Sequence, residues 1–205
     1  MLGLKQGARL TGRLRLPICR RVVSFPDNQA SMSTPAPPPK PAGLEPALVA
    51  ERPEDLHLVD GLIDRAFGPG RYVKTAERLR EHNTPRRDLS RVAWAGGEAV
   101  GCVRMWPIHI GEAPAVLLGL IAVDDAWRSQ GLGAQLIQEA CAAAERAGVA
   151  VVMLVGDEPY FGKFGFAQVP QGRAVLPGPV DWRRLMWRAL SPGALEGVEG
   201  PVRGG

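Results

Sequence analysis

Two apolar segments of strand length flank one amphipathic helix, and this arrangement constrains the fold more than any other feature of the chain. The segment AVLLGLIAV spans residues 115–123, and VAVVMLV spans residues 149–155. Runs that are apolar throughout are typical of strands buried on both faces of a sheet. Between them, over residues 131–147, apolar residues recur at helical spacing: Leu132, Leu136, Ala140, Ala143 and Ala147. This order predicts a right-handed βαβ unit with two parallel strands.

The rest of the chain predicts antiparallel strands and further helices around this unit. Residues 47–52 form a candidate strand, and a helix is expected after Pro53, with a second, more polar helix over residues 75–82. Gly96-Gly97 separates two strand-like segments and predicts a hairpin. Short elements are expected near the end, over 159–164, 166–169 and 185–189. The predicted fold class is α/β, with a mixed, mainly antiparallel sheet of six or seven strands and helices on both faces.

Composition divides the chain into three regions. Residues 1–25 hold six basic residues and no acidic one, and five prolines fall between Pro35 and Pro41. We therefore expect residues 1–43 to be a disordered basic leader and Pro-rich linker, residues 44–190 to be the folded domain, and residues 191–205 to be an irregular tail. Two interpretations of the leader remain open: residues 1–31 are an organelle transit peptide, or the true start is Met32.

Charge and cysteine usage exclude several classes of function. The pI of 9.3 comes from the leader, because residues 26–205 carry 19 basic and 21 acidic residues. A nearly neutral domain gives no charge-based case for a nucleic-acid partner. Three cysteines without a C-x-x-C pair, and three scattered histidines, predict no metal site. No apolar run approaches the length of a membrane span. The odd, widely spaced cysteines fit a reducing compartment, so we expect a cytoplasmic protein.

The stretch AWRSQGLGAQLI follows the first apolar strand and carries the main chemical signal. It lacks the Gly-Lys-Ser/Thr of a P-loop, and Leu136 stands where a dinucleotide fold has its third glycine. The remaining pattern is Arg128-x-x-Gly131-x-Gly133-Ala134 at the start of a helix. Helix N-termini present unpaired N–H groups and partial positive charge, and glycines allow close approach. This loop therefore predicts a pyrophosphate site.

Together with the flanking residues, this loop resembles the GNAT superfamily of acetyl-CoA-dependent N-acyltransferases. The likeness runs from Leu117 to Phe166, through the I-A-V strand, the R-x-x-G-x-G loop and the Y-F-x-x-F-G-F segment. It is nearest to an uncharacterised bacterial branch of that superfamily. The resemblance implies a central parallel pair that splays apart, an acetyl-CoA co-substrate without a metal, and transfer of acetyl to a primary amine. The implied partner is a small-molecule or peptide amine, with no nucleic acid and no membrane, and the protein is a monomer or homodimer.

The resemblance also assigns site residues. It implies that the strand backbone of Leu120, Ile121, Ala122 and Val123 contacts the pantetheine arm, and that a strand N–H at Leu120 or Ile121 stabilises the oxyanion. The pyrophosphate would be held by the loop formed by Arg128, Ser129, Gln130, Gly131, Leu132, Gly133 and Ala134. Many members place a catalytic tyrosine four residues before the glycine of the closing G-F pair. Here that position is Phe161, so the candidate acid is the neighbouring Tyr160.

This departure at Phe161 keeps a second function open: a non-catalytic acyl-CoA-binding or regulatory module of the same fold. The sequence identifies no general base. Asp157 and Glu158 follow a predicted central strand, where α/β sheets place their sites, but they can also be turn carboxylates. His109 and Glu112 are expected in or near the loop that ends the long meander strand.

Overall fold

The computed structural model describes residues 43–205, and these residues form one mixed sheet with helices on both faces. The leader and linker predicted for residues 1–43 lie outside the described residues as far as residue 42. The strands run in the order β1-β2-β3-β4-β5-β8-β6, while β9 pairs with β3 and β7. Their bounds are β1 Ala47–Ala50, β2 Arg91–Ala95, β3 Glu98–Ile110, β4 Ala113–Val123, β5 Val151–Val155, β6 Ala167–Gln168, β7 Ala174–Val175, β8 Leu185–Ala189 and β9 Gly200–Gly204. The predicted fold class is confirmed, but the sheet of the described residues has nine strands where six or seven were predicted.

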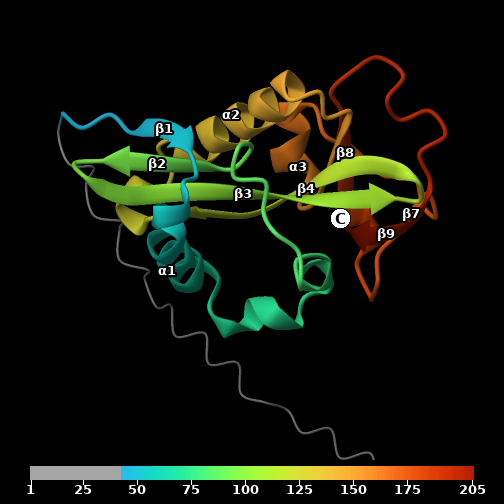
Figure 1. Ribbon diagram of the computed structural model, residues 1–205, viewed down its shortest axis with the longest axis horizontal. Helices are drawn as coiled ribbons and strands as arrows, with labels where there is room; N and C mark the ends of the chain where they lie inside the picture. Colours follow the sequence, from blue (N-terminus) through green and yellow to red (C-terminus); the bar gives the residue numbers. More distant parts are fainter. Residues whose placement is uncertain (1–42) are drawn as a thin grey trace, which may run out of the picture. The chain divides into compact units, whose positions relative to one another are not determined.

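Helices cover opposite faces of this sheet. The α-helices are α1 Leu56–Phe67, α2 Leu132–Arg146 and α3 Glu158–Phe161. In Figure 1, α1 lies below the strands and α2 lies above them. Each helix buries an apolar stripe, which consists of Val59, Leu62 and Ile63 in α1 and includes Leu132, Leu136, Ile137 and Ala140 in α2. Two separate hydrophobic cores result, one on each face.

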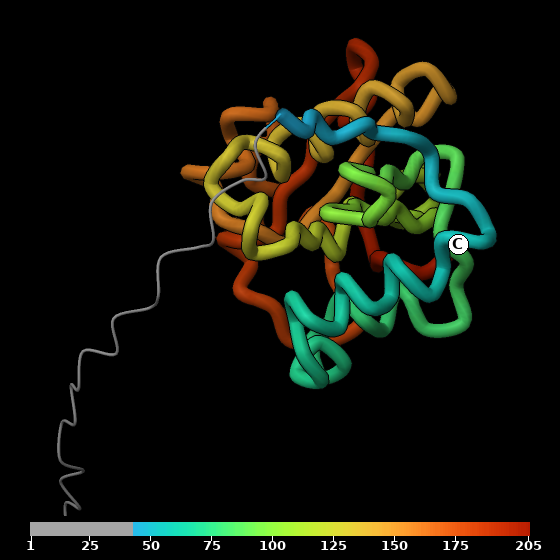
Figure 2. Tube along the Cα trace, turned by 90° about the vertical axis from the view of Figure 1, so that its left-hand side faces the viewer, coloured from blue at the N-terminus to red at the C-terminus, as the bar shows by residue number. Residues whose placement is uncertain are grey.

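Short 3-10 helices connect α1 to the central strands. They include η2 Pro69–Val73 and η3 Thr75–Leu79, which follow α1 along the same side of the strands in Figure 2 (teal). The sequence predicts a helix through residue 82, whereas η3 ends at Leu79 and His82 has a φ of 58°. A left-handed residue cannot continue a right-handed helix, so the element is shorter than predicted.

The βαβ unit joins strands that pair over only a short distance. β4 and β5 run parallel through α2, and their register pairs Val116 with Val152 and Leu117 with Met153. Beyond Leu117 the register gives no further pairing of the two strands within the described residues. On its other side β4 stays paired with β3 along its whole length. β4 therefore has an edge free of β5 in the middle of the sheet.

A β-bulge lies where β4 leaves β5. Val103 pairs with Ile121 and Arg104 pairs with Gly119, so Leu120 is the extra residue. Its φ of 53° lies in the left-handed region, which is uncommon for a residue other than glycine. Gly119 lies beside a side chain from another element, because a Cβ there would lie 2.8 Å from Nη2 of Arg80. The left-handed backbone and the close approach of Arg80 thus fall on two neighbouring residues.

The end of the chain differs from the irregular tail that the sequence predicts for residues 191–205. Gly200–Gly204 forms β9, which pairs antiparallel with β3 at Ile108–Ile110 and parallel with β7. Gly200 and Gly111 lie so close that a Cβ on Gly200 would be 2.9 Å from Cα of Gly111. Partners distant in sequence create this strand, and the local Gly-Pro-rich pattern does not indicate it.

No helix in the described part of the chain is long and apolar enough to cross a membrane.

Candidate active site

A cavity of about 520 Å³ opens where β4 and β5 separate. Leu117 and Leu120, which belong to the core on the α1 side, line it. Leu118 and Leu154, from the core on the α2 side, line it as well. Because residues of both cores meet in one cavity, the gap between the strands reaches both faces of the sheet.

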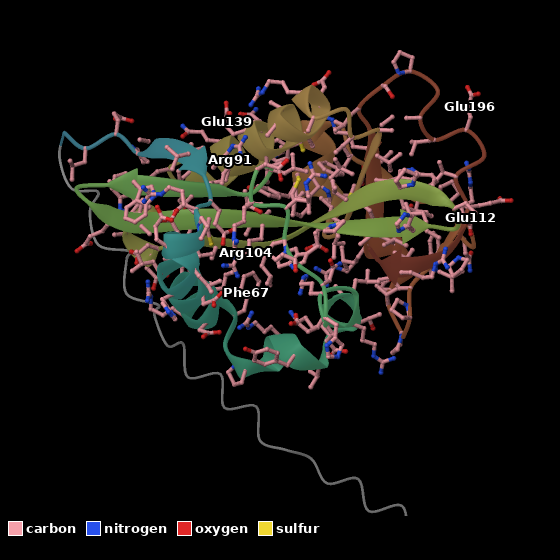
Figure 3. The ribbon with its side chains drawn as sticks, viewed as in Figure 1. Phe67, Arg91, Arg104, Glu112, Glu139 and Glu196 are labelled. Atoms are coloured by element: carbon pink, nitrogen blue, oxygen red, sulfur yellow. The ribbon has the colours of Figure 1, made fainter. Side chains whose placement is uncertain are left out.

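The wall on the α1 side carries most of the cavity's charge. It is built from the end of α1, from η2 and η3, and from the loop before β8. Its cations are Arg71, Lys74, Arg80 and Arg184, and its carboxylate is Asp181. Phe67, labelled at the end of α1 in Figure 3, is part of the same wall.

The predicted phosphate loop has the backbone geometry of an anion site. Gly131 is the N-cap residue of α2, with a φ of 83°, and no side chain caps the helix. Ser129 is also left-handed, with a φ of 61°. A Cβ on Gly131 would meet nothing within 4 Å, so the space beside the first helical N–H groups is open. Uncapped N–H groups beside open space fit a phosphate.

Arg128 supplies a full positive charge next to this helix start. Its guanidinium pairs with Asp125 at 2.9 Å, and its Nε donates to the carbonyl of Val123 at 3.3 Å. Both partners of the ion pair are mostly exposed, so the pair contributes little to stability and can exchange for another anion. The loop residues Arg128–Ala134, with Ala122 and Val123, lie outside the cavity lining, whereas Leu120 and Ile121 belong to it.

Tyr160 and Phe161 occupy different places in the site. Phe161 lines the cavity, and its ring packs so close to Gly156 that a Cβ there would lie 2.2 Å from the ring. The hydroxyl of Tyr160 instead faces the glycine loop, 3.4 Å from the position of a Cβ on Gly133. Burial raises the pKa of Tyr160. Its hydroxyl therefore keeps its proton at neutral pH and is a possible proton donor.

The candidate bases that the sequence offers do not line the cavity. Asp157 pairs with Arg184 at 2.9 Å and, with Glu158, lines a separate shallow pocket. His109 is paired in β3 opposite Pro114, so it lies in the strand and not in a loop. Glu112 lies at the tip of the hairpin between β3 and β4, far from Phe67 in Figure 3. Neither His109 nor Glu112 lines the cavity.

Sequence reasoning missed the guanidinium pair Arg71 and Arg80. Arg80 bonds Glu77 at 2.7 Å and lies over the ring of Trp106, 5.1 Å from its centroid. Arg71 bonds Asp64 at 2.7 Å and lies over the ring of Tyr72. Burial lowers the pKa of Arg80, and the charge of Arg71 adds to this effect. The only sequence signal was a basic, polar segment, which is indistinguishable from a solvated surface.

A mixed sheet whose central parallel strands separate at a bulge, beside an uncapped glycine-rich helix start, is the arrangement that the resemblance to acyl-CoA-dependent acyltransferases implies. Residues 87–168 match the family model of the acetyltransferase (GNAT) domain. Over this segment the chain is similar to the GNAT superfamily of N-acetyltransferases.

Proteins that are similar to this chain are named as N-acetyltransferases or GNAT acetyltransferases. The chain is 29% identical to the uncharacterised N-acetyltransferase YhbS of Escherichia coli K12 over 155 residues, which cover 74% of this chain and 92% of the relative. A crystal structure of E. coli YhbS in complex with CoA superposes with a TM-score of 0.68 over 81% of this chain and 92% of that one. A GNAT acetyltransferase from Brucella melitensis in complex with acetyl-CoA is 25% identical, with a TM-score of 0.55 over 78% of this chain and 94% of that one.

Proposed function

We propose that this protein transfers the acetyl group of acetyl-CoA to a primary amine by direct attack on the thioester. The observation that carries the proposal is the separation of β4 from β5 after Leu117, which opens a cavity beside the free edge of β4. The CoA and acetyl-CoA complexes of the two similar structures support the choice of co-substrate.

The described residues supply binding, orientation and charge stabilisation. The uncapped N–H groups at Gly131–Ala134 and the guanidinium of Arg128 would bind the pyrophosphate. The free backbone of Leu120–Val123 would pair with the pantetheine arm. Bound acetyl-CoA supplies an activated thioester and a thiol leaving group. An N–H of Leu120 or Ile121 would donate to the carbonyl oxygen as negative charge develops there.

Cysteine chemistry does not offer an alternative route through the described part of the chain. Cys102 and Cys141 are buried, and burial raises their pKa values to about 12 and about 11. Only a thiolate is an effective nucleophile, and these thiols stay protonated at neutral pH. This supports direct transfer over a covalent acyl-cysteine intermediate.

Thermal unfolding tests the co-substrate. Acetyl-CoA should raise the Tm of the protein, because a ligand that binds only the folded state stabilises it. Gly131→Asp should abolish this increase by placing a negative charge beside the phosphates. Gly148→Asp is the matched control, since Gly148 is also left-handed with open space around it but lies past the other end of α2. An unchanged Tm increase in Gly131→Asp would mean that the loop does not hold the phosphates.

Turnover separates the enzyme from the alternative of a non-catalytic binding module. A panel of primary amines with acetyl-CoA, followed by release of the CoA thiol, should show amine-dependent turnover. Acetyl-CoA binding without turnover on any amine would favour the binding module, which the phenylalanine at position 161 keeps open.

A further inference from the structure

The guanidinium groups of Arg71 and Arg80 lie in the cavity without a full set of partners. The side chains are 12% and 10% exposed, respectively. In each, Nε is buried and has no hydrogen-bond partner within the part of the chain that the structure describes. A buried unpaired donor on a cation is costly, and both of these cations line one cavity, where an anionic ligand would be stabilised by the two guanidinium groups.

Their position connects them to the reaction site. Nη2 of Arg80 lies 2.8 Å from the point where a Cβ on Gly119 would stand, directly beside the bulge at Leu120. Both arginines line the same cavity as Leu120 and Ile121. A ligand group bound to this pair would therefore lie next to the backbone that faces the thioester in the proposed function.

The carboxylates already present do not satisfy this cluster. Glu77 bonds only Nη1 of Arg80, through an ion pair on the same short helix. Nη2 of Arg71 donates to Asp64 and to the hydroxyl of Tyr72, but Asp64 is 60% exposed, and exposed ion pairs contribute little and exchange readily. Lys74 lines the same wall and adds a third positive charge. The local excess of donors and positive charge suits an anion.

The pyrophosphate is not that anion in the proposed arrangement. The predicted phosphate loop is the start of α2, which packs on one face of the sheet, and none of its residues lines the cavity. Arg80 follows η3, whose Leu79 belongs to the core on the opposite face. The two cationic sites therefore serve different chemical groups.

We propose that Arg71 and Arg80 bind a carboxylate of the acceptor, so that the substrate class is a small amine that carries a carboxylate. This inference rests on the proposed acetyl transfer. A guanidinium is planar and presents paired donors that match a carboxylate. A cavity of about 520 Å³ is the size of a small-molecule site, and the thioester end must share it.

Calorimetric titration of the full chain, with CoA present, tests the carboxylate directly. The probes are glycine, β-alanine and 4-aminobutyrate, each compared with its amide, which keeps the amine and removes the negative charge. At least one acid should bind, and its amide should bind about tenfold more weakly or worse, as expected for loss of a charge-assisted contact. Equal binding of acid and amide, or no binding of any acid, would overturn the proposal.

Variants assign the effect to the arginines. Arg71→Gln and Arg80→Gln should each weaken binding of the acid about tenfold or more while leaving the amide unchanged. Arg65→Gln is the control, because it removes the same charge from an exposed position of α1 outside the cavity lining. If Arg80→Gln does not fold, Arg71→Gln decides alone. Wild-type affinity for the acid in the folded variants contradicts the assignment.

The outcome is separable from that of the proposed function. If acid and amide bind alike while simple amines are acetylated, the proposed acetyl transfer is supported and the proposed carboxylate site is contradicted. If the acid binds through the arginines but no amine is acetylated, the anion site is supported and the proposed function is contradicted.

Discussion

At the scale of single residues, the most informative position is Leu120. It is Leu120, and not the neighbouring Gly119, that adopts the left-handed conformation. A leucine in this region costs about 1–2 kcal/mol, which the pairing of β3 with β4 on both sides of the bulge must offset. The bulge changes the direction of the N–H groups of β4 in the region where β4 no longer pairs with β5. Backbone strain of this kind is concentrated at functional sites.

Tyr160 gives a prediction at this scale. If its hydroxyl donates a proton to the leaving thiolate, Tyr160→Phe should lower kcat about 100-fold, the usual contribution of a positioned acid. Because burial raises the pKa of the phenol, the hydroxyl stays protonated at neutral pH, and wild-type kcat should fall only at alkaline pH, as that proton is lost. Steady-state kinetics across pH measure both effects.

The increase in Tm with acetyl-CoA is the control for Tyr160→Phe and should persist. A variant with unchanged kcat would show that the thiolate leaves without this donor. A variant that loses the Tm increase would instead assign Tyr160, whose hydroxyl faces Gly133, to co-substrate binding.

At the scale of elements, one buried ion network ties the N-terminal segment to the sheet. Arg104 of β3 bonds Glu51, which follows β1, at 2.7 Å and Asp60 of α1 at 2.6 Å. The Glu51 side chain is only 1% exposed. Figure 3 shows Arg104 on the sheet, above α1. This network fixes α1, and hence η2 and η3 after it, against the strand beside β4.

Breaking this network should be far more costly than breaking a surface pair. Arg104→Met should lower the free energy of unfolding by about 3–5 kcal/mol, because Glu51 is left buried and unpaired. Arg86→Met is the matched control, since Arg86 pairs with Asp88 on the surface, and it should cost about 1 kcal/mol or less. Urea denaturation measures both.

A double variant separates the cost of the unpaired Glu51 charge from other effects of replacing Arg104. Adding Glu51→Gln to Arg104→Met removes the stranded charge and should recover part of the loss. Equal free energies of unfolding for Arg104→Met and Arg86→Met would show that the network is not a source of stability.

Sequence reasoning identified elements where the pattern is local. The two apolar strands with their intervening helix, and the hairpin at Gly96-Gly97, follow from periodicity and turn chemistry. β9 was missed, because its pairing depends on β3, about ninety residues earlier, and not on its own composition. The glycine loop was readable because helix starts have a sequence signature. The role of Arg71 and Arg80 could not be predicted, because only the fold brings their polar segment close to the bulge.

At the scale of the whole molecule, the cavity and the glycine loop both lie within residues 43–205. We predict that a chain beginning at Met32 binds acetyl-CoA as the full chain does, because every residue assigned to the site remains. Comparison of Tm with and without acetyl-CoA for both chains measures this. Loss of the Tm increase in the shorter chain would show that residues 1–31 contribute to the binding domain.

The two walls of the cavity come from different parts of the chain. The family match begins at residue 87 and includes β4, α2 and β5, whereas Arg71 and Arg80 precede it. If both proposals hold, the residues for the co-substrate and those for the acceptor lie in separate, consecutive stretches of sequence. Exchange of η2 and η3 between relatives would then alter which amine is accepted while the acetyl donor stays the same. Diversification of such a protein would need changes only in the short segment 69–80, with the residues proposed for the co-substrate left intact.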